Sequence, residues 1–115
     1  MIRMIAALGL ALSLQAQVIN HVVVCWYNDT VDEATLKRAM EATGEFEKIP
    51  GILEVSSGKA VASERAIVDD SFSMAVHIRA ASKEALDAYL VHPIHKRFVE
   101  AYVKGKTERV VVYDF

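Results

Sequence analysis

The sequence predicts one α+β domain in which the elements follow the order β-α-β-β-α-β. Two observations support this prediction. Stretches rich in β-branched and aromatic residues, typical of strands, alternate with stretches whose apolar residues recur every three or four positions, typical of helices. The chain has 115 residues, of which 53% are apolar and 24% charged, and these values are ordinary for a single globular domain.

The first strand and the first helix are expected in the N-terminal half. Residues 18–27 are rich in valine and aromatic side chains and contain no Asp, Glu, Lys or Arg, which predicts a strand buried on both faces. Residues 30–48 have helical periodicity. Thr30 and Glu33 form the pattern of a capping box, in which each side chain satisfies a free backbone N–H group. Pro50 is expected to end the helix, because proline disfavours helical geometry in the residue before it.

Two further strands are expected in the middle of the chain. Residues 52–61 form the second strand, although the Ser-Ser-Gly sequence at 56–58 weakens its pattern. A polar connection over residues 62–70 leads to the third strand, residues 72–80. Apolar and polar residues alternate there, which predicts a strand with one buried face and one polar face. His77 belongs to the polar face.

The C-terminal third predicts two helical pieces and a closing strand. Ser82 is placed to cap the first piece. Pro93 suits the first turn of the second piece, which runs to Gly105. His92 is expected to bond a free carbonyl at the end of the first piece. Residues 110–115, VVVYDF, form the closing strand.

Residues 1–16 have the pattern of a secretory signal peptide. Arg3 supplies positive charge, residues 4–14 are apolar apart from one glycine and one serine, and cleavage is expected after Ala16. The apolar run is too short to span a membrane, which takes about 20 residues. The mature domain, residues 17–115, is therefore expected in the periplasm or outside the cell. A frayed helix or an uncleaved anchor is the alternative.

Charge and cysteine content exclude several classes of function. The net charge is −2 and the basic residues are not clustered. Nucleic acid is therefore not an expected partner, because phosphate binding requires a concentrated positive field. Cys25 is the only cysteine, which excludes an internal disulfide and a cysteine-rich zinc site. Its position within the first strand favours a buried, structural role.

Five short motifs occur in the order and at the spacing of one known family. They lie at residues 20–24, 48–52, 58–59, 88–95 and 111–115, and the most specific is AYLVHPIH at 88–95. On these residues the chain resembles the stress-responsive A/B barrel (Dabb) family. The resemblance implies a ferredoxin-like protomer with a four-stranded antiparallel sheet. It also implies a homodimer in which the two sheets close into one dimeric α/β barrel.

The resemblance further implies a site between the sheet and the helices. It places His21, Tyr89, His92 and His95 around a cavity there. In polyketide cyclases of the olivetolic acid type, a tyrosine and a histidine of the AYLxHPxH motif form the acid/base pair, and by position these are Tyr89 and His95. Met74 stands where many members have a histidine, and we expect it to line the ligand pocket together with His21 and His92.

Tyr89 and His95 are suited to proton transfer. An unperturbed histidine titrates near about pH 6.5, so it accepts a proton readily at neutral pH. A tyrosine hydroxyl donates a hydrogen bond to a developing oxyanion. The alternative is structural: His92 caps the helices, and His95 ties a helix to the sheet.

A metal site is a further alternative. His92 and His95 are three residues apart, a spacing that allows both to bind zinc, and His21 is the only candidate for a third histidine ligand. No nearby carboxylate is evident from the sequence. Haem binding would rest on fold analogy with haem-degrading monooxygenases alone. We therefore expect no cofactor.

Three hypotheses about function follow. The protein is a dimeric module that binds a small, partly apolar ligand between helices and sheet. Alternatively, it is a cofactor-independent cyclase, isomerase or lyase in which His95 is the base and Tyr89 the hydrogen-bond donor. The third hypothesis is a structural dimer without a pocket. The sequence favours the first and leaves open whether the protein is an enzyme.

Overall fold

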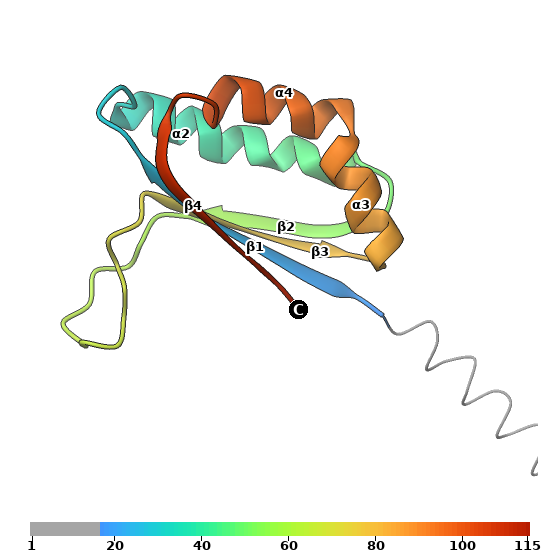
Figure 1. The fold of residues 1–115 in the computed structure, drawn as a ribbon, viewed down its shortest axis with the longest axis horizontal. Coiled ribbons are helices and arrows are strands. Elements are labelled where there is room, and N and C mark those ends of the chain that lie inside the picture. Colours follow the sequence, from blue (N-terminus) through green and yellow to red (C-terminus); the bar gives the residue numbers. More distant parts are fainter. Residues whose placement is uncertain (1–16) are drawn as a thin grey trace, which may run out of the picture.

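The structure, a computed structural model, describes residues 17–115. The expected signal peptide, residues 1–16, lies outside the described residues. The element order is the expected one, and the fold is ferredoxin-like (Figure 1). The elements are β1 (Ile19–Tyr27), α2 (Glu33–Ala42), the 3-10 helix η1 (Thr43–Lys48), β2 (Ile52–Gly58), β3 (Met74–Ala80), α3 (Lys83–Val91), α4 (Pro93–Tyr102) and β4 (Thr107–Asp114).

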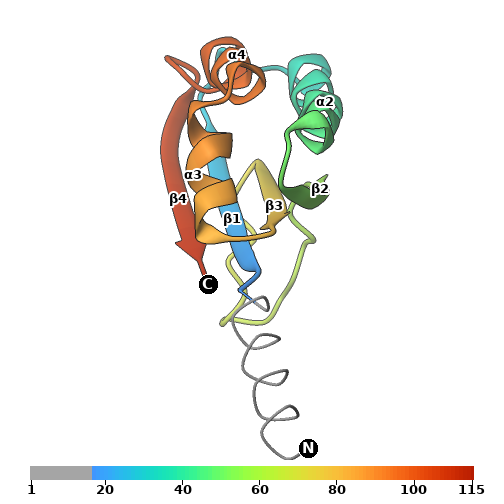
Figure 2. The ribbon, with the colours of Figure 1, turned by 90° about the vertical axis from the view of Figure 1, so that its right-hand side faces the viewer.

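The four strands form one antiparallel sheet in the order β2-β3-β1-β4. The helices all lie on one face of this sheet, and the opposite face is open (Figures 1 and 2). The register brings His21 of β1 opposite Ile78 of β3 and Asp114 of β4. The edge strand β4 therefore pairs its C-terminal residues with the first residues of β1.

The expectation that β1 is buried on both faces is wrong. His21 and Cys25 point toward the helices and are buried. Val22 and Val24 point the other way and are only half-buried, because no helix of residues 17–115 covers that face. The run of valines thus marks a central strand whose second face lacks a cover within this chain.

The start of α2 differs from the expected capping box. Asp32 is the N-cap, and its Oδ1 atom accepts a hydrogen bond from the backbone N of Thr35 at 2.8 Å. The Thr30 hydroxyl instead donates to Oδ1 of Asn28. The helical path then tightens into η1, which ends at Lys48, the end expected from the sequence.

The bend between α3 and α4 is formed largely as expected. Ser82 caps α3, since its hydroxyl accepts from the backbone N of Ala85 at 3.0 Å, and Pro93 occupies the first turn of α4. The His92 ring accepts a hydrogen bond, whereas it was expected to donate one to a carbonyl. Its Nδ1 atom accepts a hydrogen bond from the backbone N of Ile94 at 3.1 Å, so His92 caps the start of α4 and bonds no carbonyl through its ring.

β2 and β3 are shorter than expected where they flank the segment 59–73. β2 ends at Gly58 and β3 begins at Met74. The connecting segment projects on the open side of the sheet (Figures 1 and 2). Side chains fix it there, because the Trp26 indole N–H donates to the Ser71 hydroxyl at 2.9 Å. Such side-chain hydrogen bonds hold the segment beyond the ends of β2 and β3, where the backbone pairing of these strands stops.

β4 begins earlier than expected, at Thr107. It does so because β1 continues to Tyr27, which pairs with Thr107 across a bulge. Arg109, before the expected start, stacks its guanidinium over the Trp26 ring at 4.7 Å from the centroid.

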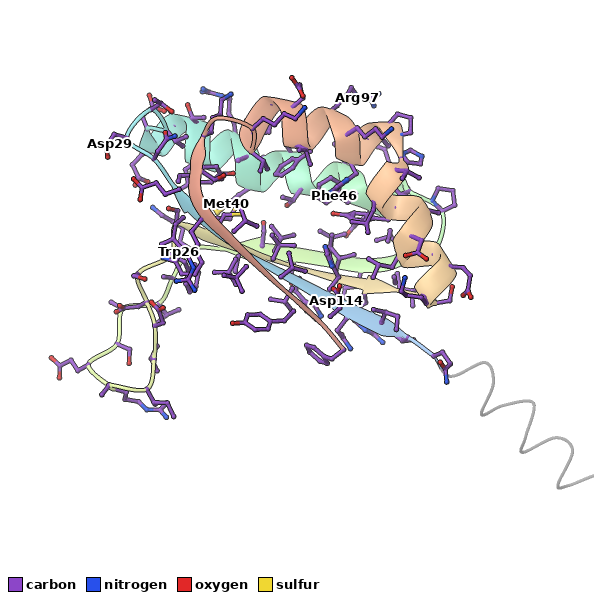
Figure 3. All side chains as sticks on the ribbon, in the orientation of Figure 1. Trp26, Asp29, Met40, Phe46, Arg97 and Asp114 are labelled. Carbon is purple, nitrogen blue, oxygen red and sulfur yellow. The ribbon has the colours of Figure 1, made fainter. Side chains whose placement is uncertain are left out.

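The core lies between the helices and the sheet. The alternation predicted for β3 is confirmed, since its four helix-facing side chains are all buried, at 4% exposure or less. Phe46 of η1 lies between the two layers (Figure 3). The buried core residues are Leu36, Ala39, Phe46, Ile49, Ile52, Met74, Val76, Ile78, Ala80, Leu86 and Tyr89.

Gly51 offers a direct test of this packing. Its φ is +88°, and a Cβ there would lie 2.7 Å from Cβ of Ala85 in α3. We predict that Gly51→Ala lowers the free energy of unfolding by about 2 kcal/mol, measured by urea denaturation. Gly44→Ala is the matched control. A Cβ at Gly44 meets nothing within 4 Å, so this variant should be neutral or slightly stabilising. Equal effects of the two substitutions would contradict the packing described.

Candidate functional site

A cavity of about 220 Å³ lies between α3, α4 and the β1–β4 half of the sheet. We call it the Tyr89 cavity. Its walls are mostly aliphatic and aromatic, with a few polar groups gathered at one end, which is the usual character of a small-molecule site. The lining residues are His21, Val23, Cys25, Phe46, Met74, Val76, Tyr89, Leu90, His95, Phe98, Val99, Val103, Val110 and Val112.

The polar end of the cavity is an aromatic cluster. Tyr89, on the last turn of α3, is 2% exposed, and its ring centroid lies 4.5 Å from that of His95 on the first turn of α4. His21 of β1 meets the same tyrosine edge-on at 5.7 Å. Phe46 packs against Tyr89 at 5.3 Å and against His95 at 5.9 Å. The structure thus brings together three of the predicted site residues, His21, Tyr89 and His95.

The backbone fixes the tautomer of His95. Its Nδ1 atom lies 3.0 Å from the carbonyl oxygen of Leu90. A carbonyl oxygen only accepts hydrogen bonds, so Nδ1 carries the proton and Nε2 keeps a free lone pair. Burial lowers the pKa of His95, while the Leu90 carbonyl opposes this effect and His21 adds to it. His95 is therefore an uncharged proton acceptor at neutral pH.

Tyr89 is held in its protonated form, which complements the unprotonated Nε2 of His95. Burial raises the pKa of its phenol far above the usual range, and no other group contributes to the shift. The hydroxyl therefore keeps its proton and is available as a hydrogen-bond donor. A neutral base and a neutral donor side by side in an apolar cavity form an arrangement suited to acid/base chemistry.

His21 is held in place by Asp114, a residue at the end of β4. Its Nδ1 atom lies 2.5 Å from Oδ1 of Asp114, and because the carboxylate accepts, Nδ1 carries the proton in this contact. Sequence reasoning missed Asp114. Its signal is alternation along β4, which places Asp114 on the same face as Val110 and Val112, although its partner becomes evident only from the strand register.

The remaining predicted residues have distinct positions. Met74 is fully buried and forms part of the apolar wall. Cys25 lies beside it, and burial raises the pKa of this thiol to about 11, so it stays uncharged. His92 does not line the cavity and acts as the cap of α4. His77 lies on the open face of the sheet and hydrogen-bonds the Asn20 side chain at 2.9 Å.

A larger, more open depression of about 560 Å³ lies between the start of α2 and the segment 59–73. Its charged groups neutralise one another in part, since Lys59 pairs with Glu33 at 2.7 Å. The hydroxyl of Tyr27 is buried beside it without a hydrogen-bond partner. The Tyr89 cavity is the candidate site, because a hydrogen-bond donor and a base lie side by side in its mostly apolar lining.

Residues 17–115 contain neither a metal cluster nor a membrane-spanning helix. No group of three or more His, Cys, Asp or Glu side chains in this range is arranged to hold a metal ion. Within the same range, no helix has both the length and the apolar character needed to cross a membrane.

The model of the stress responsive A/B barrel domain family matches residues 19–115. The chain belongs to this family. A Dabb family protein from Mesorhizobium loti shares the fold at 19% sequence identity and a TM-score of 0.68, with 85% of this chain and 94% of that chain covered. None of the curated proteins matches the sequence.

Two further solved structures widen the comparison. One is a dimeric ferredoxin-like protein of unknown function from Thermobifida fusca, with 22% identity, a TM-score of 0.73, and coverage of 88% of this chain and 92% of that one. The other is a hydroxynitrile lyase from Passiflora edulis, with 17% identity, a TM-score of 0.75, and coverage of 87% and 93%. At these identities the likeness establishes the fold alone.

The lowered pKa of His95 predicts a pH-dependent stability. The unfolded chain binds the proton near pH 6.5 and the folded chain only at lower pH. The contribution to stability is therefore complete above pH 6.5 and is lost as the pH falls toward the folded pKa. We predict that the free energy of unfolding, measured by urea denaturation, falls less between pH 7.5 and pH 5 in His95→Gln than in the parent protein. The amide of the new glutamine can still donate to Leu90. An equal fall in both proteins would contradict the assignment.

Proposed function

We propose that the protein binds a small, partly apolar compound in the Tyr89 cavity. The observation that carries this proposal is the cavity itself: an apolar enclosure of about 220 Å³ with Tyr89 and His95 side by side at one end. A ligand would place its apolar part against Met74 and Val76 and its polar atom at the Tyr89 hydroxyl. Such a division between apolar wall and few polar groups is common in small-molecule sites.

A specific observation favours a chemical step as well. Nε2 of His95 has a free lone pair while its Nδ1–H bonds Leu90, and Tyr89 retains its proton. With a carbonyl compound in the cavity, Tyr89 would donate a hydrogen bond to the carbonyl oxygen. Nε2 would take a proton from the adjacent carbon, and the C–H electron pair would pass into the enolate. Return of the proton from Nε2 to a different atom of the enolate completes an isomerisation. Attack of the enolate on a second carbonyl carbon forms a C–C bond and an alkoxide, which takes the proton from Nε2 and completes a cyclisation, and a lyase reaction is the reverse, in which that C–C bond breaks.

The comparisons support this second candidate only at the level of the fold. A hydroxynitrile lyase shares the architecture, so the same fold belongs to a lyase in another protein. The argument for this chain rests on its own Tyr89 and His95.

We further propose that the protein is a homodimer. The open face of the sheet carries an apolar stripe formed by Val22, Val24, Ala75, Val111 and Tyr113, and no helix of residues 17–115 covers it. Similar structures include one described as dimeric. Packing of two such faces would bury the stripe and give a small domain a larger core.

Export to the periplasm or the medium is a separate proposal, and it rests on the sequence of residues 1–16. Intact-mass measurement of the protein recovered from the cell envelope and the medium tests it. We expect a mature chain that begins at Gln17. A full-length chain in the cytoplasm would contradict export.

Proton transfer is tested by hydrogen–deuterium exchange. We predict that the protein accelerates exchange of the methyl protons of acetophenone in D₂O, followed by NMR. His95→Gln should abolish the acceleration, and Tyr89→Phe should reduce it about 10-fold to 1,000-fold, because it removes the donor to the oxyanion. Tyr102→Phe, on α4 but outside the cavity, is the control and should exchange as the parent does. Equal rates in all four proteins would contradict the chemical step.

Dimer formation is tested by analytical ultracentrifugation at micromolar concentration. We predict a dimer for the parent chain and a folded monomer for Val24→Glu, since the substitution would bury an unpaired carboxylate from each protomer in the interface. Val91→Glu introduces the same charge at a helix position 65% exposed and should remain dimeric. Circular dichroism confirms folding of each variant. A monomeric parent would contradict the proposed dimer.

A further inference from the structure

The charges around the Tyr89 cavity define the class of ligand it accepts. We infer that the site selects uncharged carbonyl compounds the size of a benzene ring with a substituent of two or three atoms, and that it excludes carboxylates of the same shape. This inference rests on the proposed ligand-binding function and narrows it.

The size follows from the volume. An apolar cavity of about 150 Å³ accommodates benzene, so about 220 Å³ accommodates a ring and a few further atoms. Phe46 and Phe98 both line the cavity and pack edge-on against each other at 5.0 Å, and such aromatic walls suit a ring.

The exclusion of anions follows from the absence of a cation. No Lys or Arg lines the cavity among residues 17–115. Arg97, on α4, lies on the outer side of that helix, away from the sheet (Figure 3). A carboxylate that entered the cavity would lose its hydration without gaining an ion pair, and this loss costs several kcal/mol.

The polar groups of the cavity do not offset that loss. His95 is uncharged, because burial lowers its pKa, and its free Nε2 repels an anionic oxygen. His21 brings no excess positive charge, since it is paired with the Asp114 carboxylate at 2.5 Å. Tyr89 lines the cavity and its hydroxyl is a neutral donor, and a neutral donor suits a carbonyl oxygen better than a carboxylate.

The entrance is also uncharged. The exposed side chains that line the cavity at its rim are Leu90, Val110 and Val112, with Leu90 41% exposed. No ionic group of the rim steers an anion inward.

Acetophenone and benzoate test the inference, because they have the same number of non-hydrogen atoms and differ in charge. Each is titrated into the protein at pH 7.5, and binding is followed by NMR shifts of the valine methyl groups. We expect acetophenone to bind with a Kd about 100-fold or more below that of benzoate. Tighter or equal binding of benzoate would overturn the selectivity and leave the binding function standing. No binding of either compound would contradict both.

A rim substitution supplies the complementary test. Leu90→Lys adds a cation at the mouth while its stem remains on the helix surface. We expect the ratio of the benzoate Kd to the acetophenone Kd to fall about 10-fold in this variant. Val91→Lys is the matched control, since Val91 is the next residue on α3, is exposed, and does not line the cavity. Equal gains for benzoate in both variants would show that net charge, not the cavity, controls binding, and would overturn the inference.

Discussion

The bend at His92–Pro93 is the constraint on which the site depends. On one continuous helix, residues 89 and 95 would lie about 120° apart around the axis and would not face the same volume. Pro93 starts a new helix, and the His92 ring satisfies the free N–H of Ile94 that the new helix exposes. The bend folds α4 back so that His95 packs against Tyr89 at 4.5 Å. A capping interaction outside the cavity thereby creates the pair inside it.

Burial then sets the protonation states of that pair. The same apolar walls lower the pKa of His95 and raise that of Tyr89, which leaves a neutral base beside a neutral donor. The Leu90 carbonyl determines which ring nitrogen of His95 is the base, because it accepts the Nδ1 proton and leaves Nε2 with a free lone pair. Packing, tautomer and charge are therefore consequences of one local arrangement, and they point to chemistry on uncharged carbonyl compounds.

Periodicity predicted the order of the elements, and the AYLVHPIH motif led to Tyr89 and His95, because these signals are local. Features that depend on distant residues were not predictable. Asp114 meets His21 only through the register of β1 and β4. The exposure of one face of β1 depends on which helices cover the sheet, and the valines alone do not show it. Two overlapping sequence patterns could cap α2, one beginning at Thr30 and the other at Asp32. In the structure Asp32 is the cap.

The account depends most directly on the tautomer of His95. Long-range ¹H–¹⁵N correlation spectra of the ¹⁵N-labelled protein at pH 7.5 distinguish the two ring nitrogens of each histidine. The account predicts a protonated Nδ1 and an unprotonated Nε2 for His95, with the Nε2 shift alone changing when acetophenone is added. A protonated Nε2 in the free protein would contradict it, because His95 could then not accept the proton in the proposed step.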